Sequence, residues 1–159
     1  MNVLSEILAK KRARVAAAKE AVPLDHVRRL AQERLHGSHA FIKALQADGI
    51  NIIAEFKRRS PSKGMISAEA NLTEMAQSYA AGGAVAISVL TEEDYFAGSL
   101  DDLRTIKATV ELPVLRKDFI FDEYQVYESA AAGADALLLI VAALDDESLM
   151  RLRRLAEDD

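Results

Sequence analysis

The sequence predicts an α/β protein whose strands form a parallel sheet covered by helices. From residue 50 onward the chain repeats one unit four times: a short β-branched run, a loop and a helical pattern. The runs are apolar on both faces, which is typical of strands in a parallel sheet with helices packed against it. Units of this kind, joined by right-handed crossovers, form either an open doubly wound sheet or part of a (βα)8 barrel.

Each element is predicted from its own pattern. Gly82, Gly83 and Gly133 stand where helices should end, and Pro113 stands at the first positions of the third strand, where a missing N–H is tolerated. The predicted strands are 50–58, 85–91, 112–119 and 136–141, and the helices that follow them lie near 71–81, 100–109, 123–132 and 145–156. Three further helices are predicted before the first strand, near 2–20, 24–35 and 38–47.

Composition excludes several classes of protein. The chain of 159 residues is 50% hydrophobic, enough for one domain with a core, and its lack of cysteine excludes disulfides, thiolate nucleophiles and cysteine-ligated metals. The three histidines all lie in the first 40 residues, which disfavours a histidine metal site or triad. No window reaches the roughly 18 apolar residues of a membrane span, and no signal peptide is recognisable. We therefore expect a cytoplasmic protein with no membrane partner.

Charge is distributed unevenly along the chain. Residues 1–48 hold nine Lys and Arg against five Asp and Glu, whereas the remainder is acidic. A basic segment can bind nucleic acid, but these cations sit among helical apolar positions without interleaved aromatic residues. We expect instead a solvated helix face that docks on the more acidic body, and no nucleic-acid partner.

The segment "IIAEFKRRSPSKG", residues 52–64, places charges late in an apolar strand. Because side chains alternate on a strand, Glu55 and Lys57 share one face. In "LPVLRKDFI", Lys117 is likewise late and shares a face with Leu115. In a (βα)8 barrel, inward positions near the carboxyl ends of the strands line the active-site mouth. A salt-bridge layer closing the barrel is the structural alternative, but two strands with matching lysines favour a functional cluster.

These stretches resemble indole-3-glycerol phosphate synthase, a (βα)8 TIM-barrel family of tryptophan biosynthesis. "IIAEFKRRSPSKG" is similar to the family signature, and the similarity continues through "AISVLTEEDYFAGSLDDL", "LPVLRKDFIFDEYQ" and "GADALLLIVAAL". The family also carries N-terminal helices before its barrel. The resemblance implies an N-terminal helical extension over 1–48 and the first half of a barrel, βα units 1–4, over 49–159.

The resemblance also implies an activity and a set of site residues. The reaction is ring closure, decarboxylation and dehydration of 1-(2-carboxyphenylamino)-1-deoxyribulose 5-phosphate to indole-3-glycerol phosphate, a lyase reaction without metal or organic cofactor. By resemblance, Lys117 is the general acid, Lys57 holds an anionic group of the substrate, and Glu55 holds an ammonium in place. The residues matched to substrate binding are Ser60, which would donate to the anion, and Phe96, Phe119 and Leu138, which would form apolar walls.

Two alternatives and one structural consequence remain open at this stage. Lys117 could be the nucleophile of an aldolase-like Schiff-base enzyme, or the chain could be a non-catalytic half-barrel that serves as an assembly or folding module. Because only four of eight units are present, we expect a fragment, inactive alone, with two open sheet edges. Self-association or a complementary C-terminal half-barrel would cover those edges. The acidic triplets at 92–94 and 145–147 suggest a cation site only weakly, since acidic residues at a helix start favour the dipole.

Overall fold

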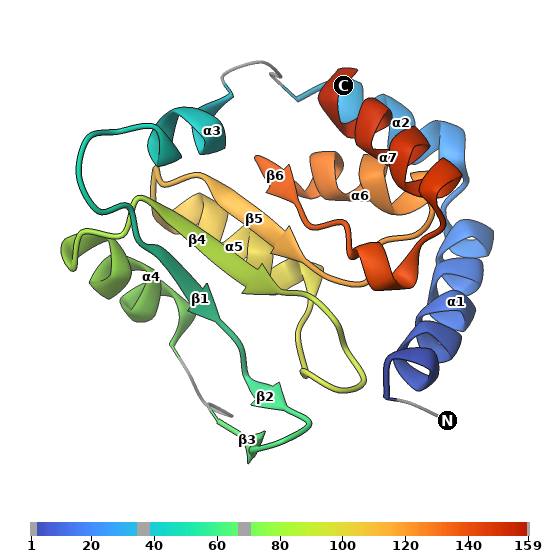
Figure 1. Cartoon of the computed structure of the whole chain (residues 1–159), viewed down its shortest axis with the longest axis horizontal. Coiled ribbons are helices and arrows are strands. Elements are labelled where there is room, and N and C mark those ends of the chain that lie inside the picture. The colour runs from blue at the N-terminus through green and yellow to red at the C-terminus, as the bar shows by residue number, and fades with distance from the viewer. Residues whose placement is uncertain (1–2, 35–38, 67–70, 159) are drawn as a thin grey trace.

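The computed structural model, which describes residues 3–34, 39–66 and 71–158, contains a four-stranded parallel sheet (Figure 1). Its strands are ordered β1-β4-β5-β6 and all neighbouring pairs are parallel. Their bounds are β1 Ile53–Phe56, β4 Ala86–Leu90, β5 Val114–Lys117 and β6 Ala136–Leu137. The parallel sheet confirms the prediction from the repeated units, and the sequential order of its strands agrees with the barrel rather than the doubly wound alternative.

Helices alternate with these strands. The bounds are α4 Leu72–Ala81, α5 Leu100–Thr109, α6 Glu123–Ala132 and α7 Asp146–Asp158. The N-terminal ends of these helices carry side-chain caps: Asn71, Ser99, Asp122 and Asp145 each accept a backbone N–H from the first turn. Gly133 ends α6 with a φ of 94°, a left-handed conformation that glycine adopts without strain.

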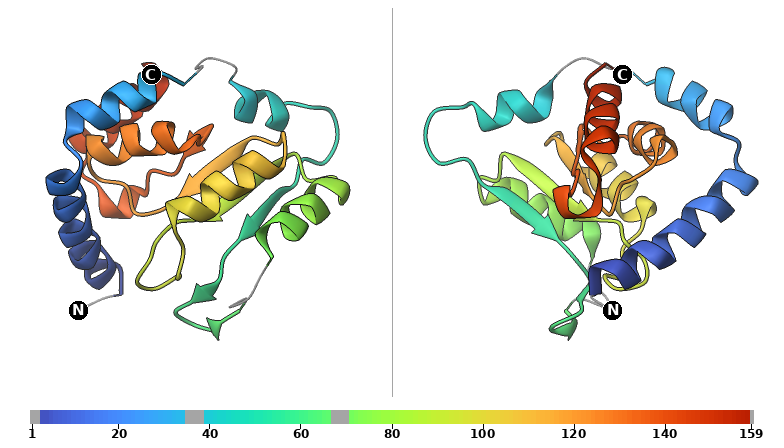
Figure 2. Two further views of the ribbon diagram at one scale, coloured as in Figure 1. Left: turned by 180° about the vertical axis from the view of Figure 1, so that it is seen from behind. Right: turned by 45° about the vertical axis from the view of Figure 1, so that its right-hand side comes forward.

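The main core lies between the sheet and its helices. Phe56, Ile87, Val89 and Val114 point from the strands to one side, where they meet residues of α4, α5 and α6 such as Leu103. Figure 2 shows α4 and α5 in front of the sheet when it is seen from behind. Glu55 and Lys117 alternate with these core residues, so they lie on the opposite face of the sheet.

Several element boundaries differ from the prediction. The first strand covers Ile53–Phe56 rather than 50–58, because Ile50 is exposed and precedes the pairing with β4. The fourth strand ends at Leu137, and a 3₁₀ helix, Val141–Ala143, occupies the predicted strand end. The loop after β1 contains a two-stranded hairpin, β2 Arg59–Ser60 with β3 Gly64–Met65, which the sequence did not predict.

Three helices precede the sheet: α1 Val3–Ala21, α2 Leu24–Gln32 and α3 Ala40–Leu45. The helix expected near 38–47 is shorter than predicted, since it begins at Ala40 and ends at Leu45. Residues 35–38 lie outside the described ranges. A second core joins the N-terminal helices to α6: Val15, Val27 and Ala31 pack with Tyr124 and Tyr127. The N-terminal helices are therefore built onto the βα units by apolar packing.

Ion pairs confirm that the basic N-terminal helix docks on the acidic body. Arg14 pairs with Asp94 at 2.7 Å, and Lys19 pairs with Asp122 at 2.7 Å. Lys11 reaches further inward and is 2% exposed. Among the described residues, no helix combines the length and the apolar character that crossing a membrane requires.

Candidate active site

Glu55, Lys57 and Lys117 form one cluster at the carboxyl ends of β1 and β5. Lys117 Nζ lies 2.7 Å from Glu55 Oε2, and Lys57 Nζ lies 3.0 Å from Glu55 Oε1. The three side chains are between 29% and 39% exposed. The expected convergence of late, inward positions on strands one and three is thus confirmed, whereas the roles of these residues stay predictions.

Strand register explains how β1 and β5 bring these groups together. Strand β4 lies between them, with Glu55 aligned to Ser88 and Lys117 aligned to Leu90. The glutamate side chain therefore spans the intervening strand and meets a lysine that extends one pleat further along β5. Tyr79 of α4 fixes the backbone of the cluster, since its hydroxyl donates to the Glu55 carbonyl at 3.1 Å.

Just beyond the cluster, Arg58 anchors the end of β1 to helix α5. Its guanidinium donates two hydrogen bonds to the Asp102 carboxylate, at 2.9 Å and 2.8 Å. Bidentate pairs of this kind fix geometry as well as contribute energy. The segment that carries Lys57 is therefore held at both ends.

The cluster carries one carboxylate and two ammonium groups. Burial acts to raise the pKa of Glu55, but hydrogen bonds from Lys117 and Lys57 outweigh it, so this pKa lies below its ordinary value. The carboxylate is thus ionised at neutral pH, and the local charge is one positive unit. Such a site can hold an anion while keeping a lysine N–H available as a proton donor.

Of the three predicted apolar wall residues, the structure shows a contact between two. The rings of Phe96, in the loop after β4, and Phe119, just after β5, have centroids 6.5 Å apart and are tilted by 35°. Both side chains are partly buried. Leu138 is also partly buried and follows β6, where its N–H donates to the Arg116 carbonyl at 3.2 Å.

Ser60 lies in strand β2 of the hairpin and is 8% exposed. Its Oγ accepts a hydrogen bond from the Lys63 N–H at 3.2 Å, which closes the turn of the hairpin. The hydroxyl proton remains free to rotate, so Ser60 can still donate to a ligand as expected. The backbone of the neighbouring Arg59 donates to the Phe96 carbonyl at 3.1 Å, which ties the hairpin to the aromatic loop.

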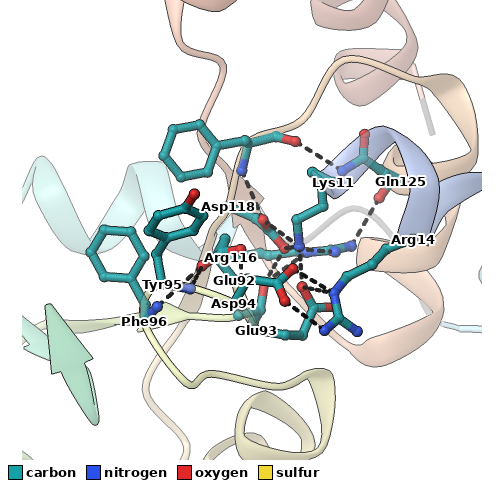
Figure 3. Close-up of polar contacts among 12 residues, drawn as sticks. Lys11, Arg14, Glu92, Glu93, Asp94, Tyr95, Phe96, Arg116, Asp118 and Gln125 are labelled. Atoms are coloured by element: carbon teal, nitrogen blue, oxygen red, sulfur yellow. Dashed lines mark hydrogen bonds and ion pairs between the residues drawn. The ribbon is translucent and has the colours of Figure 1, made fainter. Parts of the chain in front are cut away.

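A buried ionic network behind the cluster was not predicted from the sequence (Figure 3). The Asp118 carboxylate has no exposed surface and lies 2.9 Å from Lys11 Nζ and 3.0 Å from Arg116 Nη2. It also accepts from the Thr91 hydroxyl at 2.7 Å and from the Phe119 N–H at 2.8 Å. Burial raises the pKa of Asp118, but the charges of Arg116 and Lys11 outweigh it and lower that pKa.

Arg116 is nearly as buried as Asp118. Besides Asp118 and Thr91, its guanidinium donates to Glu128 Oε2 at 2.9 Å, to Ser129 Oγ at 3.1 Å and to a backbone carbonyl of α6. The sequence carried a signal for this network: Arg116 in β5 and Asp118 just after it are charged residues two positions apart in an apolar segment, the same pattern as Glu55 and Lys57.

The loop that carries Phe96 is organised around a second buried carboxylate. Glu92 has no exposed surface, and its oxygens accept from the N–H groups of Asp94, Tyr95 and Phe96 at 2.7–3.1 Å (Figure 3). The carboxylates of Glu92, Glu93 and Asp94 lie close together, but each already has a donor, namely the loop amides, Lys11 and Arg14. In the second acidic triplet, Asp146 and Glu147 lie in the first turn of α7, as expected.

The fold and the cluster define the chain as a portion of a βα-barrel protein with a charged site at the carboxyl ends of its strands. A model of the family described as indole-3-glycerol phosphate synthase matches residues 4–159. The chain belongs to this family.

Relatives named indole-3-glycerol phosphate synthase support the same conclusion. The protein of Bacteroides thetaiotaomicron is 46% identical over 157 residues, which cover 99% of this chain and 60% of that protein. The protein of Nocardioides sp. is 51% identical over 152 residues, which cover 96% and 58%. That of Neisseria meningitidis is 47% identical over 161 residues, which cover 99% and 62%. The chain thus spans about 60% of the length of the curated relatives it matches.

Proposed function

We propose that the protein containing this chain is an indole-3-glycerol phosphate synthase, in which Glu55, Lys57 and Lys117 form the catalytic cluster. The family supports the overall reaction: ring closure of 1-(2-carboxyphenylamino)-1-deoxyribulose 5-phosphate, decarboxylation and dehydration. The observation that carries the assignment of residues is the pair of ammonium groups on one carboxylate at the strand ends.

Each group of the cluster has a role that its position supports. Lys117 Nζ donates a proton to the ribulose C2 oxygen as the aryl carbon attacks C2 and the new C–C bond forms. Lys57 binds an anionic group of the same substrate through its ammonium. Glu55 bridges the two lysines and holds both ammonium groups at the site.

Three apolar side chains and one hydroxyl complete the proposed site. Phe96 and Phe119, whose rings already meet, form walls for the anthranilate ring, and Leu138 adds a third apolar surface. Ser60 donates to the anion held by Lys57. We assign residues 1–48 to an N-terminal helical extension and residues 49–159 to the first half of the barrel, and place the protein in the cytoplasm.

The test is turnover by the full-length protein that contains this chain. Incubation with 1-(2-carboxyphenylamino)-1-deoxyribulose 5-phosphate should release carbon dioxide and form indole-3-glycerol phosphate. Indole fluorescence and mass spectrometry measure the product. Substrate that stays unchanged would overturn the proposal.

A Schiff-base enzyme is the second candidate, and the ammonium of Lys117 is its only support. Borohydride treatment in the presence of a carbonyl substrate separates the two. A mass increase on the peptide that carries Lys117 would favour the aldolase-like mechanism, and its absence during turnover favours acid catalysis.

A further inference from the structure

The buried Lys11 of helix α1 connects the two segments that carry Phe96 and Phe119. Its Nζ lies 2.6 Å from Glu93 Oε2 and 2.9 Å from Asp118 Oδ1 (Figure 3). Glu93 belongs to the loop of Phe96, and Asp118 immediately precedes Phe119. One ammonium from the N-terminal extension therefore bridges two carboxylates on different βα loops.

Asp118 is hydrogen-bonded directly to the backbone of Phe119, and Glu93 belongs to the loop that carries Phe96. Asp118 Oδ1 accepts the Phe119 N–H at 2.8 Å, so the position of this carboxylate sets the backbone direction just after β5. In the Phe96 loop, Glu93 follows Glu92, whose carboxylate accepts hydrogen bonds from the backbone N–H groups of Tyr95 and Phe96. A shift of Asp118 would therefore move the backbone that presents Phe119, and Lys11 fixes the Phe96 loop through its ion pair with Glu93.

The bridge is also electrostatically necessary. Without the ammonium, the carboxylates of Glu93 and Asp118 would face one another across the space that Nζ occupies. Asp118 would retain Arg116 as its cation, whereas among the described residues the other cation paired with Glu93 is Arg14, whose Nε lies 3.8 Å away. Repulsion in a partly desolvated region would separate the two loops.

We propose that Lys11 is a positioning residue, through which the N-terminal helix holds Phe96 and Phe119 at the spacing required to bind the aryl ring of the substrate. The substrate part of this inference rests on the proposed function. The positional part rests on contacts alone. It predicts that α1 determines substrate affinity although no group of that helix belongs to the catalytic cluster.

The experiment compares Lys11→Met with Lys19→Met in the full-length protein. Both variants remove one ammonium from the same helix, but Lys19 pairs with Asp122 at the surface, where its side chain is 40% exposed. Amide hydrogen exchange is measured over residues 92–98 and 118–122, with helix α5 as the internal reference. Lys11→Met should speed exchange in both segments by at least about tenfold, which corresponds to about 1.4 kcal/mol of lost local stability. Lys19→Met should leave the exchange of residues 92–98 unchanged.

Steady-state kinetics supply a second, separate readout. Lys11→Met should raise KM by between about tenfold and a hundredfold and change kcat by less than about threefold. The reason is that Phe96 and Phe119 shift, whereas the ion pair between Lys117 and Glu55 is kept. If the wild-type protein does not turn the substrate over, the proposed function fails, but the exchange data still decide whether Lys11 orders the two loops. Uniform acceleration of exchange across the whole protein, or no acceleration in either segment, would overturn the inference.

Glu93→Gln keeps the test valid should Lys11→Met fail to fold. Glu93 is 37% exposed, so its neutralisation leaves the buried pair of Lys11 and Asp118 intact. This variant should speed exchange in residues 92–98 and leave residues 118–122 unchanged. If each segment exchanged at the same rate in Glu93→Gln as in wild type, the proposed link between Glu93 and Lys11 would be contradicted.

Discussion

Asp118→Asn should be one of the most destabilising conservative substitutions in the chain. The substitution keeps the shape of the side chain but removes the charge that faces Lys11 and Arg116, whose side chains are each only 3% exposed. Removing one partner of a buried ion pair costs about 3–5 kcal/mol. Lys11 keeps Glu93 and Arg116 keeps Glu128 as partners, so we expect the lower end of this range, about 3 kcal/mol. A domain of this kind is stable by only about 5–15 kcal/mol, so the loss is a large fraction of the total.

Urea unfolding followed by circular dichroism measures this loss. With an m-value of about 2 kcal/mol/M, the midpoint of Asp118→Asn should fall by about 1.5 M relative to wild type. Asp94→Asn is the matched control, because Asp94 pairs with Arg14 near the surface, where such pairs contribute about 0.2–1 kcal/mol. A midpoint for Asp118→Asn that falls no further than that of Asp94→Asn would refute the reasoning.

The pH dependence of the stability difference between wild type and Asp118→Asn tests whether the ionised form of Asp118 stabilises the fold. The pKa of Asp118 is lowered in the folded protein, so its ionised form stabilises the fold at pH values above the unfolded pKa of about 3.9. The stability difference between wild type and Asp118→Asn should therefore be constant from pH 5 to 7 and shrink as the pH falls below about 4.

Three further outcomes follow from the structure. Gly98→Ala should destabilise the protein by about 1–3 kcal/mol in urea unfolding, because a Cβ at Gly98 would collide with the Leu90 backbone carbonyl, and an unchanged midpoint would show that the loop yields. Glu55→Gln should lower kcat of the full-length protein by between about tenfold and a hundredfold, because a neutral amide loses the ionic hydrogen bonds to both lysines. A steady-state assay at saturating substrate measures this loss, and a kcat equal to that of wild type would contradict the prediction. The 159-residue chain alone should self-associate at micromolar concentration in sedimentation, because the apolar side chains of Ile50 and Ile52, just before β1, and of Ile53, within it, are exposed. A monodisperse monomer with cooperative unfolding would contradict this.

The sheet could be predicted from the sequence because each unit carries its own local signals. Apolar runs and helix-ending glycines such as Gly133 act within a few residues, so the approximate positions of strands and helices followed from them, whereas the strand order rested on the resemblance. The end of the last strand could not be predicted in this way. "ALLLIV" is apolar throughout, but its pairing with β5 covers only Ala136 and Leu137, and pairing depends on a neighbour rather than on the run itself.

The candidate site likewise has a part that could be predicted from the sequence and a part that could not. Glu55, Lys57 and Lys117 could be predicted to converge because a two-residue alternation and the parallel register place them at one end of one face. The partners of Asp118 could not, since Lys11 lies 107 residues earlier in the sequence and appeared there as one of several lysines on a helix. Only tertiary packing of α1 singles it out.

The most direct test of the proposed catalytic cluster is the turnover of Lys117→Ala in the full-length protein, with Lys43→Ala, an exposed lysine of α3, as control. Production of indole-3-glycerol phosphate is measured at saturating substrate, together with the urea midpoint of each variant. Lys117→Ala should lose about 10²–10⁴-fold in kcat while its free energy of unfolding stays within about 0.5 kcal/mol of wild type, because a general acid at a strand end contributes chemistry rather than packing. Wild-type kcat with a lowered midpoint would show instead that Lys117 is a structural partner of Glu55, and the assignment of the cluster would be wrong.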